Sequence, residues 1–227
     1  MPCQLVVNSV YNGLMDDPVS TKSDEISKPI ARRGRPVATA AKIAAMKKAI
    51  ANEARALFSA DGYRAISMRR IAAGVGCTPM SLYSYYPGKI YILRQLWEEL
   101  FEELFADLEF VANQITLPAE RLRSVSLGYV NYWLENPEHY RMVFITEGVS
   151  QPEVSVFVNQ DRISGYYYLF HTLIEAVICA KDETTILRAE ALICALNGIA
   201  HNLITISGYK WSKPDQLVNA VVIGLTS

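Results

Sequence analysis

The stretch that decides the fold is ISMRRIAAGVGCTPMSLYSYYPGK, residues 66–89. Ser67 is a good N-cap residue, because its hydroxyl can accept a hydrogen bond from the free N–H groups of a helix start. It precedes a short helical segment at 68–74. The next three residues, 75–77, are centred on Gly76, which favours a tight turn. The first half of the stretch therefore predicts a short helix that ends in a turn.

A second short helix follows at once. Thr78 and Pro79 have the order of an N-cap and a proline at the first helical position, where a missing N–H group costs nothing. Pro87 and Gly88 end the segment after about two turns. Two short helices joined by a tight glycine turn predict a helix-turn-helix, whose second helix normally enters the major groove of DNA.

The second helix has one inward stripe and one outward face. Leu82 and Tyr86 are four positions apart and can share the inward stripe. The outward face then presents Pro79, Met80, Ser81 and Ser84 to the groove, with Tyr83 and Tyr85 beside it. The two tyrosine hydroxyls can reach phosphates, and Lys89 adds a positive charge at the start of the next helix.

The charge of the chain is unevenly distributed. Residues 31–94 hold twelve Lys or Arg and two acids, a net charge of +10, although the whole chain has a net charge of −1. Residues 1–30 carry −2 and residues 95–227 carry −9. A basic segment joined to an acidic one indicates a polyanion-binding module attached to a part with a different role. A solvated charged surface would show the same pattern, so the charge alone leaves both interpretations open.

Helical periodicity extends over most of the chain. We expect helices at 39–61, 89–115, 118–135, 138–146, 153–180, 182–207 and 214–225. No segment alternates with a period of two, so the predicted fold class is all-α. We divide the chain into a flexible leader at 1–30, a helix-turn-helix domain with a basic arm at 31–90, and a second helical domain at 91–227.

The sequence contains no recognisable catalytic or metal-binding constellation. The three histidines are thirty or more residues apart, and the four cysteines form no CxxC pair. The longest apolar stretch, 191–206, is interrupted by polar residues and is shorter than the roughly 20 residues that span a bilayer. We expect a cytoplasmic protein without metal or cofactor. Cys77 is either a small apolar residue in the turn or a redox sensor.

Residues 66–89 resemble the DNA-binding signature of TetR-family transcriptional regulators. The preceding segment ALFSADGY at 56–63 is similar to the end of that family's first helix. The resemblance covers about residues 38–93. The family usually has Val at Cys77, a small residue at Met80, Thr at Ser81 and a polar residue at Gly88. These departures leave the fold unaffected but make the DNA sequence that is bound unpredictable.

The resemblance implies a homodimer of all-α subunits that binds a palindromic operator, usually as a repressor. A small ligand in the helical domain at 91–227 would release the DNA, so this domain is expected to bind the ligand and to dimerise. The positions that correspond to DNA contacts are Arg33, Arg35, Ser67, Arg69, Thr78, Pro79, Met80, Ser81, Tyr83, Ser84, Tyr85 and Lys89. Arg69 is expected to approach a guanine. Arg32, Arg33 and Arg35 form an arm that either enters the minor groove or only tethers the protein.

The second domain carries a weaker resemblance. Residues 132–144, YWLENPEHYRMVF, resemble a segment of one TetR C-terminal subgroup, and 195–200 resemble its His-Gly helix with Asn197 in place of His. The candidate ligand-binding residues are Tyr129, Trp133, Tyr140, Phe144, Tyr167, Phe170 and His171. A plain hydrophobic core explains the same aromatic spacing. The last two helices are expected to pair with their copies in a partner subunit.

Two other functions remain open at this stage. The protein could bind DNA as a TetR-like regulator without an inducer, or under the control of a protein partner. It could also be a helical enzyme whose basic segment is only a solvated surface.

Overall fold

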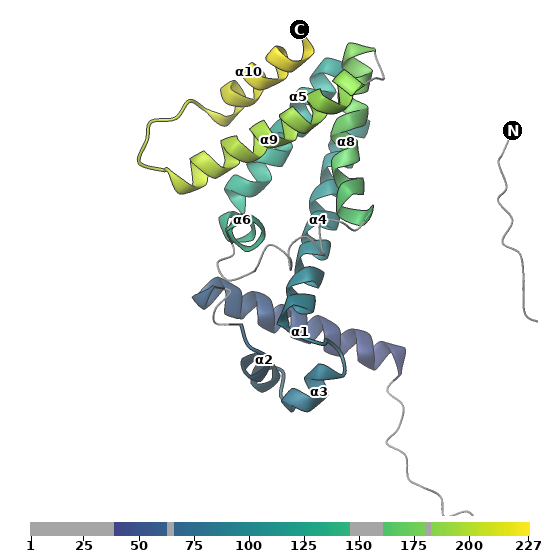
Figure 1. Cartoon of the computed structure of the whole chain (residues 1–227), viewed down its shortest axis with the longest axis vertical. Helices are drawn as coiled ribbons and strands as arrows, with labels where there is room; N and C mark the ends of the chain where they lie inside the picture. The colour runs from purple at the N-terminus through teal and green to yellow at the C-terminus, as the bar shows by residue number, and fades with distance from the viewer. Residues whose placement is uncertain (1–38, 63–65, 146–160, 180–182) are drawn as a thin grey trace, which may run out of the picture. The chain divides into compact units, whose positions relative to one another are not determined.

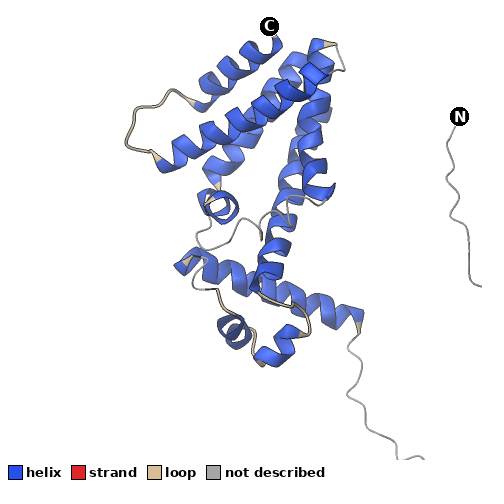
Figure 2. Ribbon diagram, viewed as in Figure 1, coloured by secondary structure: helices blue, strands red, loops and turns tan. Residues whose placement is uncertain are grey.

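The computed structural model describes residues 39–62, 66–145, 161–179 and 183–227. Within these ranges the regular elements are helices, and no strand is present (Figures 1 and 2). The all-α prediction is therefore confirmed. The expected leader at 1–30 and the arm with Arg32, Arg33 and Arg35 lie outside the described residues.

The N-terminal helices begin and end as the local sequence predicts. Helix α1 spans Ala40–Asp61, and the Thr39 hydroxyl caps it by accepting from the Lys42 N–H group. Gly62 follows with φ of 73°, a left-handed conformation that glycine adopts without a steric penalty. Helix α2 spans Met68–Gly74.

The turn between the two short helices depends on Gly76. Its φ is 70°, and the backbone N–H groups around it bind carbonyls in the last turns of α2. The N–H of Cys77 reaches the Ala72 carbonyl at 2.9 Å, and the N–H of Val75 reaches the Ile71 carbonyl at 3.0 Å. These bonds satisfy carbonyls at the end of α2 and direct the chain into α3.

Helix α3 spans Pro79–Tyr83 and is shorter than the two turns expected from the sequence. After Tyr83 the chain continues as a turn, in which the Leu82 carbonyl accepts from the N–H groups of both Tyr85 and Tyr86. The physical reason is Pro87, whose ring disfavours helical backbone angles at the residue before it. The predicted end at Pro87 was therefore too late.

The N-terminal helices share a small apolar core. Ile50, Ile71 and Leu82 are fully buried, and Tyr86 is 5% exposed. The predicted inward positions Leu82 and Tyr86 are thus confirmed. Ile43 shares the three- and four-residue apolar spacing of α1, but it is 38% exposed, because the buried stripe of α1 begins only at Ile50.

The remaining helices pack around α5. They are α4 at Lys89–Gln114, α5 at Pro118–Glu135, α6 at Pro137–Phe144, α8 at Asp161–Ile178, α9 at Glu183–Thr205 and α10 at Pro214–Thr226. Helix α5 contacts α4, α6, α8, α9 and α10, and it carries the fully buried Tyr129 and Trp133 (Figure 1). Helix α4 contacts α1 as well as α5 and α8, so it belongs to both groups of helices.

The predicted boundaries in this part agree with the observed ones to within one or two residues, apart from two segments. Residues 153–160, expected at the start of a helix, and Thr146, expected at the end of another, lie outside the described residues. In the described part of the chain, no helix is both long and apolar enough to cross a membrane.

Substitutions on opposite faces of α3 test this packing. Leu82→Ala should lower the free energy of unfolding by about 2–5 kcal/mol, because it opens a cavity in the core beneath α3. Met80→Ala lies two positions away at a side chain that is 81% exposed, and it should change the stability by about 0.5 kcal/mol or less. Urea unfolding followed by circular dichroism measures both, and equal losses of stability would contradict the orientation of α3.

Candidate nucleic-acid interface and aromatic core

The face of α3 opposite Leu82 is exposed. Met80 is 81% and Tyr83 is 51% exposed, and Pro79 is exposed beside them. Ser84 is also exposed, while Ser81 and Tyr85 are half-buried. The structure therefore places the predicted groove-facing residues together on one surface, although their contact with DNA stays a prediction.

Several hydroxyl groups on this surface form hydrogen bonds within the helix or at its ends. Thr78 Oγ1 accepts from the Ser81 N–H group at 3.1 Å, and it donates to Ser81 Oγ at 3.2 Å. Ser84 Oγ donates to the Ser81 carbonyl at 2.6 Å. Ser67 Oγ similarly caps α2 by accepting from the Arg70 N–H group at 3.2 Å. These hydroxyls shape the exposed face of α3, on which Met80 and Tyr83 are the exposed large side chains.

Two adjacent arginines at the start of α2 differ in their environment. Arg70 forms an ion pair with Asp61 of α1 at 2.8 Å, so its guanidinium is directed toward α1. Arg69 is exposed and makes no hydrogen bond or ion pair with another described residue. Arg69 therefore keeps its donors available, as the predicted contact with a base requires.

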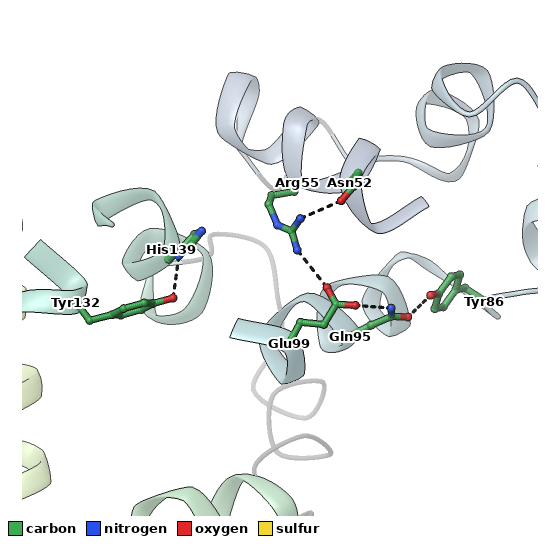
Figure 3. A network of polar contacts seen from close by, with 7 residues as sticks. All are labelled: Asn52, Arg55, Tyr86, Gln95, Glu99, Tyr132 and His139. Carbon is green, nitrogen blue, oxygen red and sulfur yellow. Dashed lines mark hydrogen bonds and ion pairs between the residues drawn. The ribbon is translucent and has the colours of Figure 1, made fainter. Parts of the chain in front are cut away.

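A chain of hydrogen bonds leads from the base of α3 to α1. The Tyr86 hydroxyl donates to Gln95 Oε1, and Gln95 Nε2 donates to Glu99 Oε1 at 2.7 Å. Glu99 Oε2 then accepts from Arg55 Nη2 at 3.2 Å, and Figure 3 shows how the chain crosses from α4 to α1. Arg55 also donates to Asn52 at 3.1 Å. Tyr86 thus joins α3, α4 and α1 through one side chain and its partners.

The Tyr86 hydroxyl remains protonated in this arrangement. Burial and the nearby Glu99 carboxylate raise the pKa of Tyr86 to about 12. Lys47 of α1 lies over its ring, 5.5 Å from the ring centre, and forms a cation–π contact. A phenol that stays neutral can donate to Gln95 throughout the physiological pH range.

These features match a known family of DNA-binding proteins. Residues 50–96, which include the end of α1, all of α2 and α3, and the start of α4, match the profile of bacterial regulatory proteins of the tetR family. This segment is therefore similar to the TetR family of bacterial regulatory proteins. A comparison with curated protein sequences gives no match.

Solved structures show that the TetR fold extends over both groups of helices. A TetR/AcrR-family regulator from Thermobifida fusca superposes with a TM-score of 0.59 and 18% identity, covering 80% of this chain and 97% of that one. FadR from Bacillus subtilis, solved with stearoyl-CoA, gives 0.64 and 15% over 79% and 97%. RolR, solved with resorcinol, gives 0.55 and 19% over 83% and 90%.

The helical body formed by α4–α6 and α8–α10 contains a dense cluster of aromatic rings. Six of the predicted ligand-binding residues belong to it, namely Tyr129, Trp133, Tyr140, Phe144, Tyr167 and Phe170. Phe101 and Phe105 of α4 join the same cluster. His171 does not, since its ring stacks on that of Tyr168, which is 55% exposed. His171 follows the buried Phe170 by one residue and is itself half-buried.

The cluster encloses a small set of neutral polar groups. The Tyr129 hydroxyl donates to Asn197 Oδ1 at 2.8 Å, which links α5 to α9. Burial raises the pKa of Tyr129 well above its usual value, and the neighbouring Tyr167 hydroxyl adds to this effect. Burial also raises the pKa of Tyr167. Both phenols therefore stay uncharged, and Asn197, the position that departs from the subgroup pattern, is their shared partner.

A cleft of about 260 Å³ lies where α1, α4 and α6 meet. It is lined by Arg55, Leu96, Glu99, Leu100, Glu103, His139 and Met142. His139 Nδ1 lies 3.1 Å from the Tyr132 hydroxyl (Figure 3). Within the described residues, no three His, Cys, Asp or Glu side chains are placed to hold a metal ion.

Sequence reasoning missed the junction between α1 and α4. Gln95 and Glu99 are four positions apart on the acid-rich surface of α4, a spacing that allows them to interact. Nothing in the sequence indicated that Arg55, 44 residues from Glu99, would face them. The many Lys and Arg residues in 31–94 suggested only DNA contacts. The sequence therefore could not distinguish Arg55, which binds α4, from the other basic residues.

His139, which lines the cleft between α1, α4 and α6, should make the stability of the protein depend on pH. Burial lowers the pKa of His139 below its ordinary value of 6.5, with Arg55 acting in the same direction and Glu138 and Glu103 opposing. The unfolded chain therefore binds a proton at His139 before the folded protein does, and stability falls as the pH drops below 6.5. His139→Gln should flatten this part of the profile, measured by urea unfolding at several pH values between about 7 and 5.

Tyr132→Phe is the matched control for His139→Gln. It removes the hydrogen bond to His139 but keeps the titrating group, so the loss of stability on acidification should remain. If stability depends on pH in His139→Gln as it does in the unaltered protein, His139 is not the group responsible.

Proposed function

We propose that this protein is a TetR-family homodimeric repressor that binds a palindromic operator and is released by a small molecule. The observation that carries the proposal is the recognition surface of α3. Its exposed residues lie on a base made by the buried Leu82 and Tyr86, within the basic segment at 31–94. We assign residues 31–90 to DNA binding and 91–227 to effector binding and dimerisation, in the cytoplasm and without a cofactor.

The DNA contacts divide into two classes by chemistry. Arg69, Pro79, Met80 and Ser81 approach base edges in the major groove, where side chains can distinguish base pairs. Ser67, Tyr83, Tyr85 and Lys89 contact the phosphate backbone, while Ser84 faces the groove and Thr78 caps α3. Arg33 and Arg35 of the basic arm add electrostatic attraction to the phosphates.

The face formed by α9 and α10 supports the dimer. An apolar groove of about 240 Å³ is lined by Ala195, Gly198, Ile199, Asn202 and Leu203 of α9, together with Trp211 and Leu217. Small residues on a helix surface allow another helix to approach closely, and α10 also exposes 56% of Ile223. A second copy related by a twofold axis would cover this groove with its own α9 and α10.

Helix α4 supports control by an effector, because it contacts both parts of the protein. Phe101 and Phe105 of α4 contribute rings to the aromatic cluster, while Gln95 and Glu99 join the hydrogen-bond chain to Tyr86 and Arg55. A ligand among the rings would therefore shift the helix that holds α1 and α3. Stearoyl-CoA in FadR and resorcinol in RolR show that proteins of this fold are solved with small organic ligands.

A second candidate is a TetR-like regulator without an inducer, or one controlled by a protein partner. The observation in its favour is the filling of the helical body, where Tyr129, Trp133 and Phe170 are all fully buried and in ring contact. Titration of the protein with small organic ligands distinguishes this candidate from the first.

Binding to DNA tests the roles assigned to Lys89 and Met80. Footprinting on the DNA upstream of the protein's own gene should reveal one protected palindrome. Lys89→Ala should weaken binding to all sequences alike and reduce the slope of log affinity against log salt by about one, because a phosphate contact is lost. Met80→Ala should instead change the preference among operator variants. Equal effects of the two substitutions, or only weak sequence-blind binding by the unaltered protein, would contradict the proposal.

Oligomeric state tests the face formed by α9 and α10. A side chain at Gly198 would meet no atom within 4 Å in the single subunit, so Gly198→Lys should fold normally. The same side chain would lie in the proposed interface and should convert the dimer to a monomer, as measured by light scattering after gel filtration. Gly165 of α8 is equally open, and Gly165→Lys should leave the dimer intact. A dimer that survives Gly198→Lys would exclude this face.

A further inference from the structure

The aromatic cluster contains a buried donor that no described residue uses. Trp133 is 0% exposed, and its indole Nε1 has no hydrogen-bond partner. It lies near enough to Tyr129 to lower the pKa of that hydroxyl slightly, without making a hydrogen bond of normal geometry. An unsatisfied buried N–H group is rare in folded proteins, since leaving it unpaired costs stability.

The surroundings of this N–H group are rings from three helices. The Trp133 ring lies 6.1 Å from Phe101 of α4, 5.9 Å from Tyr129 of α5 and 5.3 Å from Phe144 of α6, centre to centre. All three contacts are edge-to-face. Phe144 is 38% exposed, so it forms the rim of the cluster on this side. Flat aromatic molecules make the same kind of contact with such rings.

Among the described residues, the polar groups near Trp133 are neutral. Tyr129 and Tyr167 are phenols whose pKa values burial raises, and Asn197 is an amide. Among the described residues, the buried polar side chains are Ser126 and Thr185, and no charged side chain is buried. A carboxylate or phosphate placed here would lose its hydration without gaining a counter-charge.

We propose that Trp133 is the recognition residue of the effector site, and that the effector is an uncharged aromatic compound with a hydrogen-bond-accepting oxygen. The oxygen, a hydroxyl or carbonyl, accepts from Trp133 Nε1, and the ring packs among Phe101, Tyr140 and Phe144. This inference rests on the proposed function and specifies the ligand class of its effector site. An acyl thioester would present a similar carbonyl oxygen, but its long aliphatic chain does not match a lining of rings.

Two pairs of matched probes test the inference in the full-length protein. Phenol and toluene have nearly the same shape, but only phenol carries the oxygen. Phenol should bind more tightly than toluene, by about 3- to 10-fold for one neutral hydrogen bond, and Trp133→Phe should abolish the difference. Benzoate, a charged analogue, should bind more weakly than phenol. Toluene that binds as well as phenol, or benzoate that binds better, would overturn the inference.

Trp97→Phe is the control substitution. Trp97 is 4% exposed and lies on α4, but its Nε1 donates to the Met142 carbonyl at 3.1 Å. Both substitutions remove similar volume from the core, yet only Trp97→Phe breaks a hydrogen bond. The urea midpoint should therefore fall further in Trp97→Phe than in Trp133→Phe, while phenol affinity should fall only in Trp133→Phe. The reverse pattern would contradict the role of Trp133.

An NMR measurement on the unaltered protein gives an answer even if Trp133→Phe does not fold. In ¹⁵N-labelled protein, the indole N–H signal of Trp133 should move downfield on addition of phenol, while that of Trp97 should move less. Release of DNA by stearoyl-CoA without a shift of the Trp133 signal would overturn the inference and leave the proposed function standing. Operator binding that no probe affects, with no shift of the Trp133 signal, would overturn the inference and favour regulation without an inducer.

Discussion

The arrangement of the N-terminal helices depends on Tyr86. Its ring is buried beside Leu82 beneath α3 and supports Lys47 on one side, while its hydroxyl reaches Gln95 of α4. One residue therefore fixes the base of the recognition helix and ties it to the helix that continues into the body. The apolar contacts of the ring provide most of the stability, since a single neutral hydrogen bond contributes about 1 kcal/mol.

The ion pair at the other end of this chain of hydrogen bonds has a different role. Arg55 and Glu99 are 39% and 43% exposed, and pairs at this degree of exposure contribute about 0–1 kcal/mol. It can therefore break at little cost when α4 moves relative to α1. A strong packed contact at Tyr86 and a weak polar contact at Arg55 would let α4 turn α1 while α3 stays attached, as the proposed effector-controlled release of DNA requires.

The sequence predicted the helix-turn-helix well because its signals are local. Ser67, Thr78, Pro79 and Gly76 act within a few residues of themselves, so their effects do not depend on the rest of the fold. Contacts between distant parts of the chain decide other features that local signals do not show. The exposure of Ile43 depends on where α2 and α4 meet α1, and the stacking of His171 on Tyr168 depends on which side of α8 faces the aromatic cluster. Periodicity gives the spacing of a buried stripe but not its absolute orientation or its end.

By itself, the sequence determined most of the described helical boundaries, although not the end of α3, together with the inward stripe of Leu82 and Tyr86 and the uneven distribution of charge. Each of these follows from backbone preferences or from residue composition, which need no knowledge of distant contacts. Only the tertiary structure decided which basic side chains bind other helices, such as Arg55. It also decided which polar groups lie within the aromatic core, such as Asn197 and Tyr129. It also showed that the Trp133 N–H group is buried without a partner among the described residues. Hydrogen bonding depends on the positions of atoms that come from separate helices, and no local sequence pattern specifies those positions.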